Sequence, residues 1–151
     1  MTVSALKLSG EIIRRMSAKD RTVTNLSVQK LAYFCHGWHL ALTGDPLVDE
    51  GFAAWKFGPV LPSVYHKLKV FSSNPIPASH PFVAATSTEP LGETSSQIID
   101  KVLDVYGRYS GAQLVSMSHV ESGPWHSAWE ASSDAIENDQ IETYFKSLIK
   151  R

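Results

Sequence analysis

The chain has 151 residues, of which 43% are apolar and 19% charged, and its formal net charge is −1. This composition is typical of a globular domain and excludes a largely disordered chain. The 14 Lys and Arg residues are scattered, so the sequence lacks the basic stripe that phosphate backbones require, and we expect no direct nucleic-acid binding.

Cysteine content and hydropathy indicate the compartment. Cys35 is the only cysteine, which excludes an intrachain disulfide and is typical of the reducing cytoplasm. No apolar run approaches the roughly 20 residues of a membrane-spanning helix, and the N-terminus lacks the apolar stretch of a signal peptide. We therefore expect a cytoplasmic protein without a membrane segment, with one domain over residues 1–151.

Two helices are predicted in the first third of the chain. Apolar residues recur at helical spacing over residues 4–19, and the basic residues Arg14 and Arg15 fall near the solvent-facing end of this helix. A longer helix begins at Thr24 or Asn25, either of which suits the N-cap, and stops at Gly44. Since apolar side chains surround most of the second helix, we expect it to be the central helix of the fold.

The middle of the chain predicts less regular structure. Residues 51–57, GFAAWKF, are short, aromatic and bounded by glycines, which indicates a strand or extended segment. Gly58 and Pro59 predict a turn from strand to helix, with Pro59 or Pro62 in the first turn of that helix. Residues 72–93 hold four of the eight prolines and predict a loop, with a short strand at FVAAT.

Helices return in the last third. Thr94 with Gln97 has the spacing of a capping box, and Ser110 with Gln113 repeats it, so each pair predicts a helix start. Pro124 predicts the first turn of a further helix, and Asn138 the cap of the last one. The complete prediction is a mainly α, single compact domain of about six or seven helices with a minor short β element.

Candidates for metal binding and catalysis have stronger structural explanations. His36 and His39 share a helix face, but zinc needs three or four ligands, so packed or hydrogen-bonded histidines are favoured over a metal site. Cys35 lies in an apolar helix, where a free cysteine behaves as a small hydrophobe more often than as a nucleophile. Hydrolase and phosphate-loop motifs are absent from the sequence. No catalytic residue, metal or cofactor is predicted.

Two aromatic stretches, residues 54–69 and 118–129, remain as candidate binding surfaces. Tryptophan and tyrosine are enriched at binding hot spots because they combine a large apolar area with one polar group. The candidate partner-binding residues are Trp55, Lys56, Tyr65, His66, Lys69, His119 and Trp125. A role in the core is about as probable for Trp55 or Trp125. The direction in which Trp55, Lys56 and Tyr65 point separates scaffold from interface.

Two other function classes stay open. An enzyme of unknown reaction would need Lys56, His119 and His126 to converge in one pocket with shifted pKa values. A prophage protein that interacts with its host would instead show a self-assembling surface.

Three segments in a fixed order carry a resemblance to a known family. They are LSVQKLAYFCHGWHLALTGDPLVDEGFAAWKFGPVLPSVYHKLK at 26–69, SHVESGPWHSAW at 118–129 and IENDQIETYF at 136–145. The most specific parts are Gln29-Lys30-Leu31, Gly37-Trp38-His39, Ala54-Trp55-Lys56, Gly58-Pro59-Val60 and Pro124-Trp125. Together they resemble the Panacea domain, which is also called the SocA-like or GepA-like phage-associated domain.

The resemblance implies a function of the binding class. It implies a helical antitoxin of a type II toxin–antitoxin pair that binds and neutralises a cognate protein toxin encoded beside it. Neutralisation in the family proceeds by direct binding or, in one member type, by a proteolytic adaptor role that delivers the toxin to the ClpXP protease. The family has no agreed catalytic residues, so the resemblance implies no enzyme activity.

Overall fold

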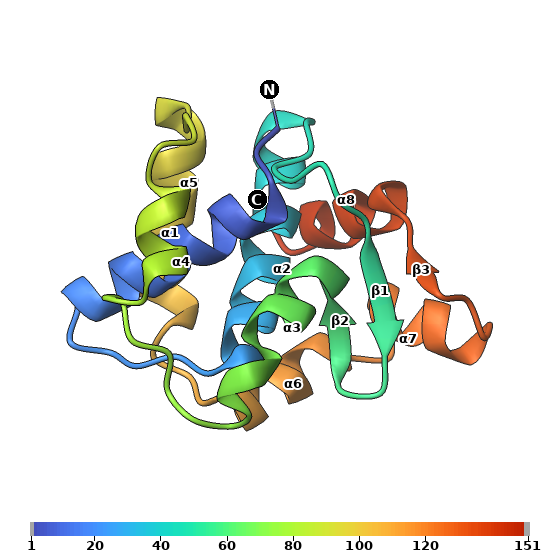
Figure 1. The fold of residues 1–151 in the computed structure, drawn as a ribbon. Helices are drawn as coiled ribbons and strands as arrows, with labels where there is room; N and C mark the ends of the chain where they lie inside the picture. The colour runs from blue at the N-terminus through green and yellow to red at the C-terminus, as the bar shows by residue number, and fades with distance from the viewer. Residues whose placement is uncertain (1, 150–151) are drawn as a thin grey trace.

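The computed structural model describes residues 2–149 (Figure 1). Within that range the chain forms eight α-helices, one 3₁₀ turn (η1) and one three-stranded sheet. In chain order the elements are α1 (Ala5–Ala18), α2 (Asn25–Thr43), β1 (Phe52–Trp55), β2 (Gly58–Val60), α3 (Pro62–Leu68), η1 (Lys69–Phe71), α4 (Pro81–Thr86), α5 (Glu93–Tyr106), α6 (Gly111–Ser118), α7 (Pro124–Glu130), β3 (Ala135–Ile136) and α8 (Asn138–Ser147). The predicted mainly α class with a minor β element is confirmed.

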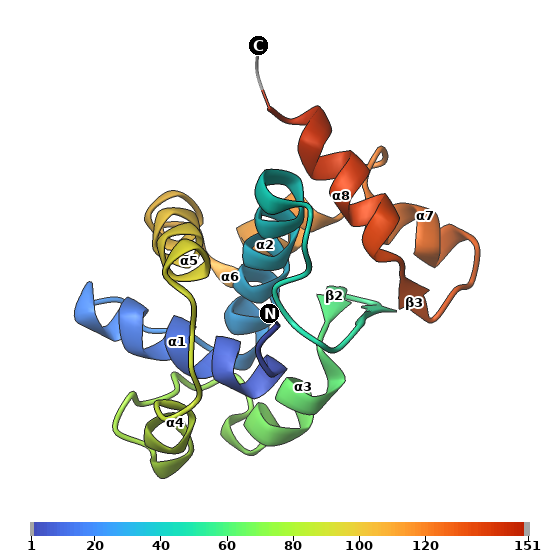
Figure 2. The same ribbon diagram turned by 90° about the horizontal axis from the view of Figure 1, so that it is seen from above.

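Helix α2 is the central helix, as its sequence predicts. Its ends are those expected: the Thr24 and Ser27 side chains form a reciprocal capping box, and Gly44 ends the helix with a φ of +79°. The helices α1, α5, α6 and α8 pack around α2 (Figure 2). A Cβ at Gly37 would lie 2.1 Å from the Phe145 ring, so α8 approaches α2 closely because residue 37 has no side chain. No helix within residues 2–149 has the length and apolar character needed to cross a membrane.

The sheet is antiparallel with strand order β2-β1-β3. Trp55 pairs with Gly58, so Lys56 and Phe57 form a two-residue hairpin turn. Gly58 has a φ of +111°, whereas neither turn residue has a positive φ. Type I′ and II′ hairpin turns have a positive φ at one or both turn residues. In this hairpin the positive φ falls on the residue after the turn, where a glycine adopts it without steric cost.

The predicted strand-to-helix turn at Gly58-Pro59 is wrong. Both residues belong to β2, and only Pro62 lies in the first turn of α3. A proline is tolerated in β2 because this strand lies at an edge of the sheet. The β3 strand was not predicted either, because its two residues are too short for an alternating pattern to show.

Three predictions in the second half of the chain also need correction. The FVAAT segment lies in the short helix α4 and is not a strand, which raises the helix count above six or seven. Helix α5 begins at Glu93 after Gly92, so Thr94 lies inside it and forms no capping box. Asn138 is the first residue of α8, and its side chain bonds to His36 instead of capping the helix. Ser110 and Gln113 do form the expected capping box.

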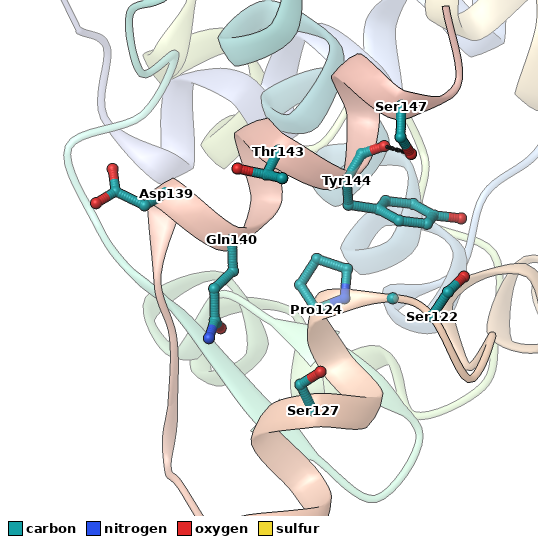
Figure 3. Close-up of a pocket in the computed structure, with 9 residues that line it drawn as sticks. Ser122, Pro124, Ser127, Asp139, Gln140, Thr143, Tyr144 and Ser147 are labelled. Atoms are coloured by element: carbon teal, nitrogen blue, oxygen red, sulfur yellow. Dashed lines mark hydrogen bonds between the residues drawn. The ribbon is translucent and has the colours of Figure 1, made fainter.

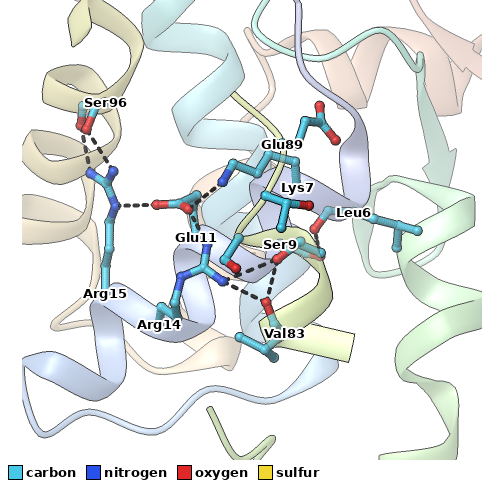
Figure 4. Close-up of polar contacts among 12 residues, drawn as sticks. Leu6, Lys7, Ser9, Glu11, Arg14, Arg15, Val83, Glu89 and Ser96 are labelled. Carbon is cyan, nitrogen blue, oxygen red and sulfur yellow. Dashed lines mark hydrogen bonds and ion pairs between the residues drawn. The ribbon is translucent and has the colours of Figure 1, made fainter. Parts of the chain in front are cut away.

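A buried ionic cluster joins α1 to α4 and α5 (Figure 4). The Glu11 carboxylate accepts from Lys7 Nζ at 2.9 Å, from Arg15 Nε at 3.0 Å and from Arg14. Arg14 also donates to the Val83 carbonyl at 2.7 Å, and the Arg15 guanidinium bonds to the backbone and side chain of Ser96. Arg14 and Arg15 are therefore half-buried connectors and not the solvent-facing residues that the sequence predicted.

Candidate functional site

A groove of about 620 Å³ lies between the N-terminal half of α2, the β1–β2 hairpin, α3 and the start of α6. Its lining residues are Thr24, Asn25, Leu26, Gln29, Lys30, Trp55, Lys56, Phe57, Val60, Tyr65, Ser72, Ser73, Gly111 and Ala112. Three of the predicted partner-binding residues, Trp55, Lys56 and Tyr65, thus line one cavity. We call this cavity the hairpin groove.

Trp55 and Tyr65 form an aromatic wall of the hairpin groove. Their rings meet edge to face, with centroids 5.0 Å apart and planes at 72°. Burial alternates along β1, so Ala54 faces the core while Trp55, one residue later, is half-buried at the groove. Trp55 is therefore neither wholly scaffold nor wholly surface, since one part of the indole packs and another stays accessible.

The tip of the hairpin is exposed. Phe57 has 59% of its surface accessible, and Lys56 Nζ lies 5.6 Å from the centroid of the Phe57 ring, within cation–π range. An exposed aromatic beside a cation, on a short turn held by a sheet, is a suitable contact for another protein.

The base of the hairpin groove consists of polar side chains that support the hairpin. Gln29 accepts from the Leu61 backbone N–H at 2.8 Å, and Lys30 Nζ donates to the Pro59 carbonyl at 2.8 Å. These bonds satisfy backbone groups at and just after edge strand β2, on the side that no further strand covers. The side chain of Lys30 is completely buried, and burial lowers its pKa to about 7.

Lys30 is the main residue of the groove that chemical reasoning from the sequence missed. None of the ion pairs among residues 2–149 includes it. The sequence did indicate a buried lysine at position 30, because a lysine in a helix that is apolar nearly all round has no solvent-facing side to occupy.

Behind the hairpin, His119, Trp125 and Trp129 form a stack. The His119 and Trp125 rings are parallel, with centroids 3.7 Å apart, and Trp129 continues the stack at 5.5 Å. Trp125 is only 5% exposed, and its Nε1 donates to the Trp55 carbonyl at 2.7 Å. Burial lowers the pKa of His119, and the nearby charge of Lys30 lowers it further. The stack therefore supports the hairpin from the inner side.

The remaining predicted partner-binding residues lie elsewhere. His66 is exposed on α3 and Lys69 is exposed at the start of η1, and neither lines the hairpin groove. Contact with a partner stays a prediction for both, as it does for the buried Trp125.

The three residues of the catalytic alternative do not share the hairpin groove, which is lined by Lys56 but by neither His119 nor His126. His119 is stacked on Trp125. His126 Nε2 lies 3.8 Å from Glu130 Oε1 on the same helix. The convergence that the enzyme hypothesis requires is not seen in this cavity.

The paired histidines of α2 are held by protein groups. His36 Nδ1 accepts from backbone N–H groups of the segment after α2, so its Nε2–H donates to Asn138 Oδ1 at 2.9 Å. His39 bonds to the Asp45 carbonyl at 2.7 Å and to Ser95 Oγ at 2.8 Å. Burial lowers the pKa of His36 to about 4. Within residues 2–149, no three or more His, Cys, Asp or Glu side chains are grouped as metal ligands would be.

Cys35 occupies the interior of the fold. Its side chain is completely buried, and burial raises the pKa of the thiol. A neutral, enclosed thiol cannot act as a nucleophile, so the structure agrees with the small-hydrophobe interpretation.

Two further cavities were not predicted. A polar one of about 420 Å³ lies between α7 and α8 and is lined by Ser127, Thr143 and Tyr144 among others (Figure 3). An apolar groove of about 620 Å³ lies between α2, α5 and the residues just after α8, and it includes the exposed Leu42.

Comparison with known proteins gives two matches. The family model described as "Antitoxin SocA-like, Panacea domain" matches residues 28–126, a range that contains most of the hairpin groove. The chain is also 36% identical over 137 residues to a protein named Antitoxin SocA from Caulobacter vibrioides (strain NA1000 / CB15N). That match covers 82% of this chain and 69% of the relative. No solved structure matches the chain.

Proposed function

The chain belongs to the family of SocA-like antitoxins with the Panacea domain, and from this premise we propose that it binds and neutralises a cognate protein toxin in the cytoplasm. The observation that carries the proposal is the 36% identity to Antitoxin SocA over most of the chain. Membership of an antitoxin family favours a binding role without catalysis. The groove supports this role, because Trp55 and Tyr65 give it an aromatic wall and Phe57 gives it an exposed aromatic rim.

The proposed toxin-binding surface is the outer face of the β1–β2 hairpin with α3. Trp55 and Tyr65 form the wall of the hairpin groove, and Phe57 and Lys56 form its exposed rim. Exposed, rigidly held aromatics beside a cation are the residues that dominate protein–protein contacts. His66 and Lys69 extend this surface along the exposed side of α3 and η1, and Trp125 supports it from within.

Two modes of neutralisation are compatible with this surface. In the first, the bound antitoxin blocks the toxin directly. In the second, it acts as an adaptor that delivers the toxin to the ClpXP protease. The half-life of the toxin in cells with and without ClpXP separates the two modes, since only delivery makes toxin loss depend on the protease.

The proposal is tested with the product of the neighbouring gene. Expressed alone it should stop growth, and co-expression of this protein should restore growth and allow the two to be purified together. Trp55→Ala should weaken the complex by about 2 kcal/mol or more, roughly 30-fold in Kd, because a central aromatic anchor is lost. A neighbouring product that neither inhibits growth nor binds would contradict the proposal.

A matched control is Trp129→Ala. Trp129 is 44% exposed and lies on α7, where it is the last ring of the stack and does not line the hairpin groove. Both variants need an unfolding curve, so that weaker binding is not confused with loss of fold. Equal binding by wild type and a folded Trp55→Ala variant would remove Trp55 from the interface.

A further inference from the structure

The charges of the hairpin groove are of one sign. Its fourteen lining residues include two lysines, Lys30 and Lys56, and no aspartate or glutamate. The whole chain has a formal charge of −1, so this cationic lining is a local property and not a reflection of overall composition. A cleft lined by one sign of charge attracts the opposite sign.

Lys30 at the base is incompletely satisfied. Its ammonium has three N–H donors, and among residues 2–149 its one hydrogen bond runs to the Pro59 carbonyl. No carboxylate of that range pairs with it, although the side chain is completely buried. A buried cation without an anion is costly, and an anion arriving in the groove would offset that cost.

Lys56 gives the second charge at the rim. It is exposed and held near the Phe57 ring at the hairpin tip, so it can meet an incoming partner before the groove is filled. The apolar surface of the groove includes the wall, Trp55 and Tyr65, and Leu26 on α2.

We propose that the hairpin groove binds an acidic segment of the toxin, with a carboxylate at the exposed Lys56, above the buried Lys30, and an adjacent apolar side chain against Trp55 and Tyr65. This inference rests on the proposed antitoxin function and adds the chemistry of the segment that is recognised. The carboxylate completes the charge balance of the groove, and the apolar neighbour covers the aromatic wall from water.

The test measures the affinity of the purified neighbouring gene product for wild type and for two variants. Lys56→Glu should weaken binding at least about tenfold, because it places a carboxylate opposite the toxin's own. Lys30→Met should also weaken it, because the charge below the groove is lost; since the hydrogen bond to the Pro59 carbonyl is lost too, its unfolding midpoint is measured beside its affinity. Higher salt should weaken the wild-type complex more than the Lys56→Glu complex.

The matched control is Lys101→Glu. Lys101 is an exposed lysine on α5 that borders the separate apolar groove, so its reversal changes net charge equally but should leave binding unchanged. If Lys30→Met does not fold, comparison of Lys56→Glu with Lys101→Glu still tests whether the groove binds an acidic segment. Conversely, an Asp or Glu of the toxin changed to Lys should restore binding to Lys56→Glu.

The outcomes separate this inference from the proposed function. Tight binding by wild type with unchanged affinity for Lys56→Glu and for folded Lys30→Met would overturn the acidic-segment inference and leave the antitoxin function standing. Equal weakening by Lys56→Glu and Lys101→Glu would also overturn it, because a general charge effect would then explain both. Failure of wild type to bind the neighbouring product would overturn the proposed function itself.

Discussion

The buried charges of α1 and of α2 are compensated very differently. On α1, burial alone would raise the pKa of Glu11, but hydrogen bonds from Lys7, Arg14 and Arg15 hold it at about 2. On α2, Lys30 has a single carbonyl partner, and burial lowers its pKa to about 7. The α1 cluster pairs its charges within one helix, whereas Lys30 has no anionic partner among residues 2–149.

This difference separates a structural role from a binding role. A buried charge whose partners are complete holds elements together, and removing one member leaves the others unpaired. A buried charge with incomplete partners lowers the stability of the isolated chain. The proposed acidic segment would supply the missing anion, which is why the proposal places recognition near α2 and not at α1.

The largest expected effect is at the α1 cluster. Glu11→Gln should lower the free energy of unfolding by about 3–5 kcal/mol, because Lys7, only 3% exposed, loses its buried anion. Urea denaturation at neutral pH measures the change. Glu142→Gln is the control: it breaks an exposed pair with Lys146 on α8 and should cost less than about 0.5 kcal/mol. Similar losses of unfolding free energy for the two variants would show that the buried Glu11 cluster stabilises the fold no more than the exposed pair does.

The Glu11 carboxylate also predicts that the protein loses stability in acid. The pKa of Glu11 is about 2 in the fold and 4.5 in the unfolded chain, so its stabilisation is complete above pH 4.5 and is lost as pH falls towards 2. Unfolding midpoints of wild type should therefore fall across this range more steeply than those of Glu11→Gln. Parallel curves for the two proteins would show that Glu11 is not the group responsible.

Lys30 should show the opposite dependence. Its pKa is about 7 in the fold and 10.5 when unfolded, so between these values the unfolded chain binds more protons and stability rises with pH. The slope is at most about 1.4 kcal/mol per pH unit. Lys30→Met should remove this rise, as unfolding curves at neutral and mildly alkaline pH would show. A rise that persists in Lys30→Met would assign it to another group.

The smallest expected effect concerns Gly58, the first residue of β2, which lies against Lys30. A Cβ at Gly58 would lie 2.9 Å from Lys30 Cε and 2.7 Å from Ser118 Oγ, at a φ of +111°. Gly58→Ala should therefore cost about 1–3 kcal/mol of stability, because residue 58 keeps an unfavourable backbone conformation and the Ser118 and Lys30 side chains must shift. Gly51→Ala is the control, since a Cβ there meets nothing within 4 Å. Thermal unfolding of both variants tests the difference, and equal midpoints would contradict it.

The predictions from sequence that hold depend on local signals. Helix α2 was predicted with its cap at Thr24 or Asn25 and its stop at Gly44, and the structure has Thr24 and Gly44, because capping and left-handed termination involve only neighbouring residues. The errors arise where non-local partners decide. Gly58-Pro59 joins a sheet only because β1 lies beside it, and Thr94 lies inside α5 although its spacing to Gln97 matches a capping box.

The candidate site divides in the same way. Trp55, Lys56 and Tyr65 could be selected from residue type and spacing, and the structure brings them to one groove. His66, Lys69 and Trp125 were selected on the same grounds, but they lie outside the lining of that groove. Whether a side chain reaches a cavity depends on the rotation and packing of its element, and residue type does not encode that.

The sequence by itself determined the helical class, the central helix, the family resemblance and the aromatic stretch at the hairpin. Periodicity, caps and composition are properties of neighbouring residues, and these features follow from them. Only the tertiary structure decided that the Glu11 cluster is buried against α4 and α5, while Lys30 has one carbonyl partner and lies at the base of a groove. The reason is physical: the energy of a buried charge depends on every group within a few ångströms, and here those groups include Val83, Ser96 and Pro59, which are distant in the chain from the charges they meet.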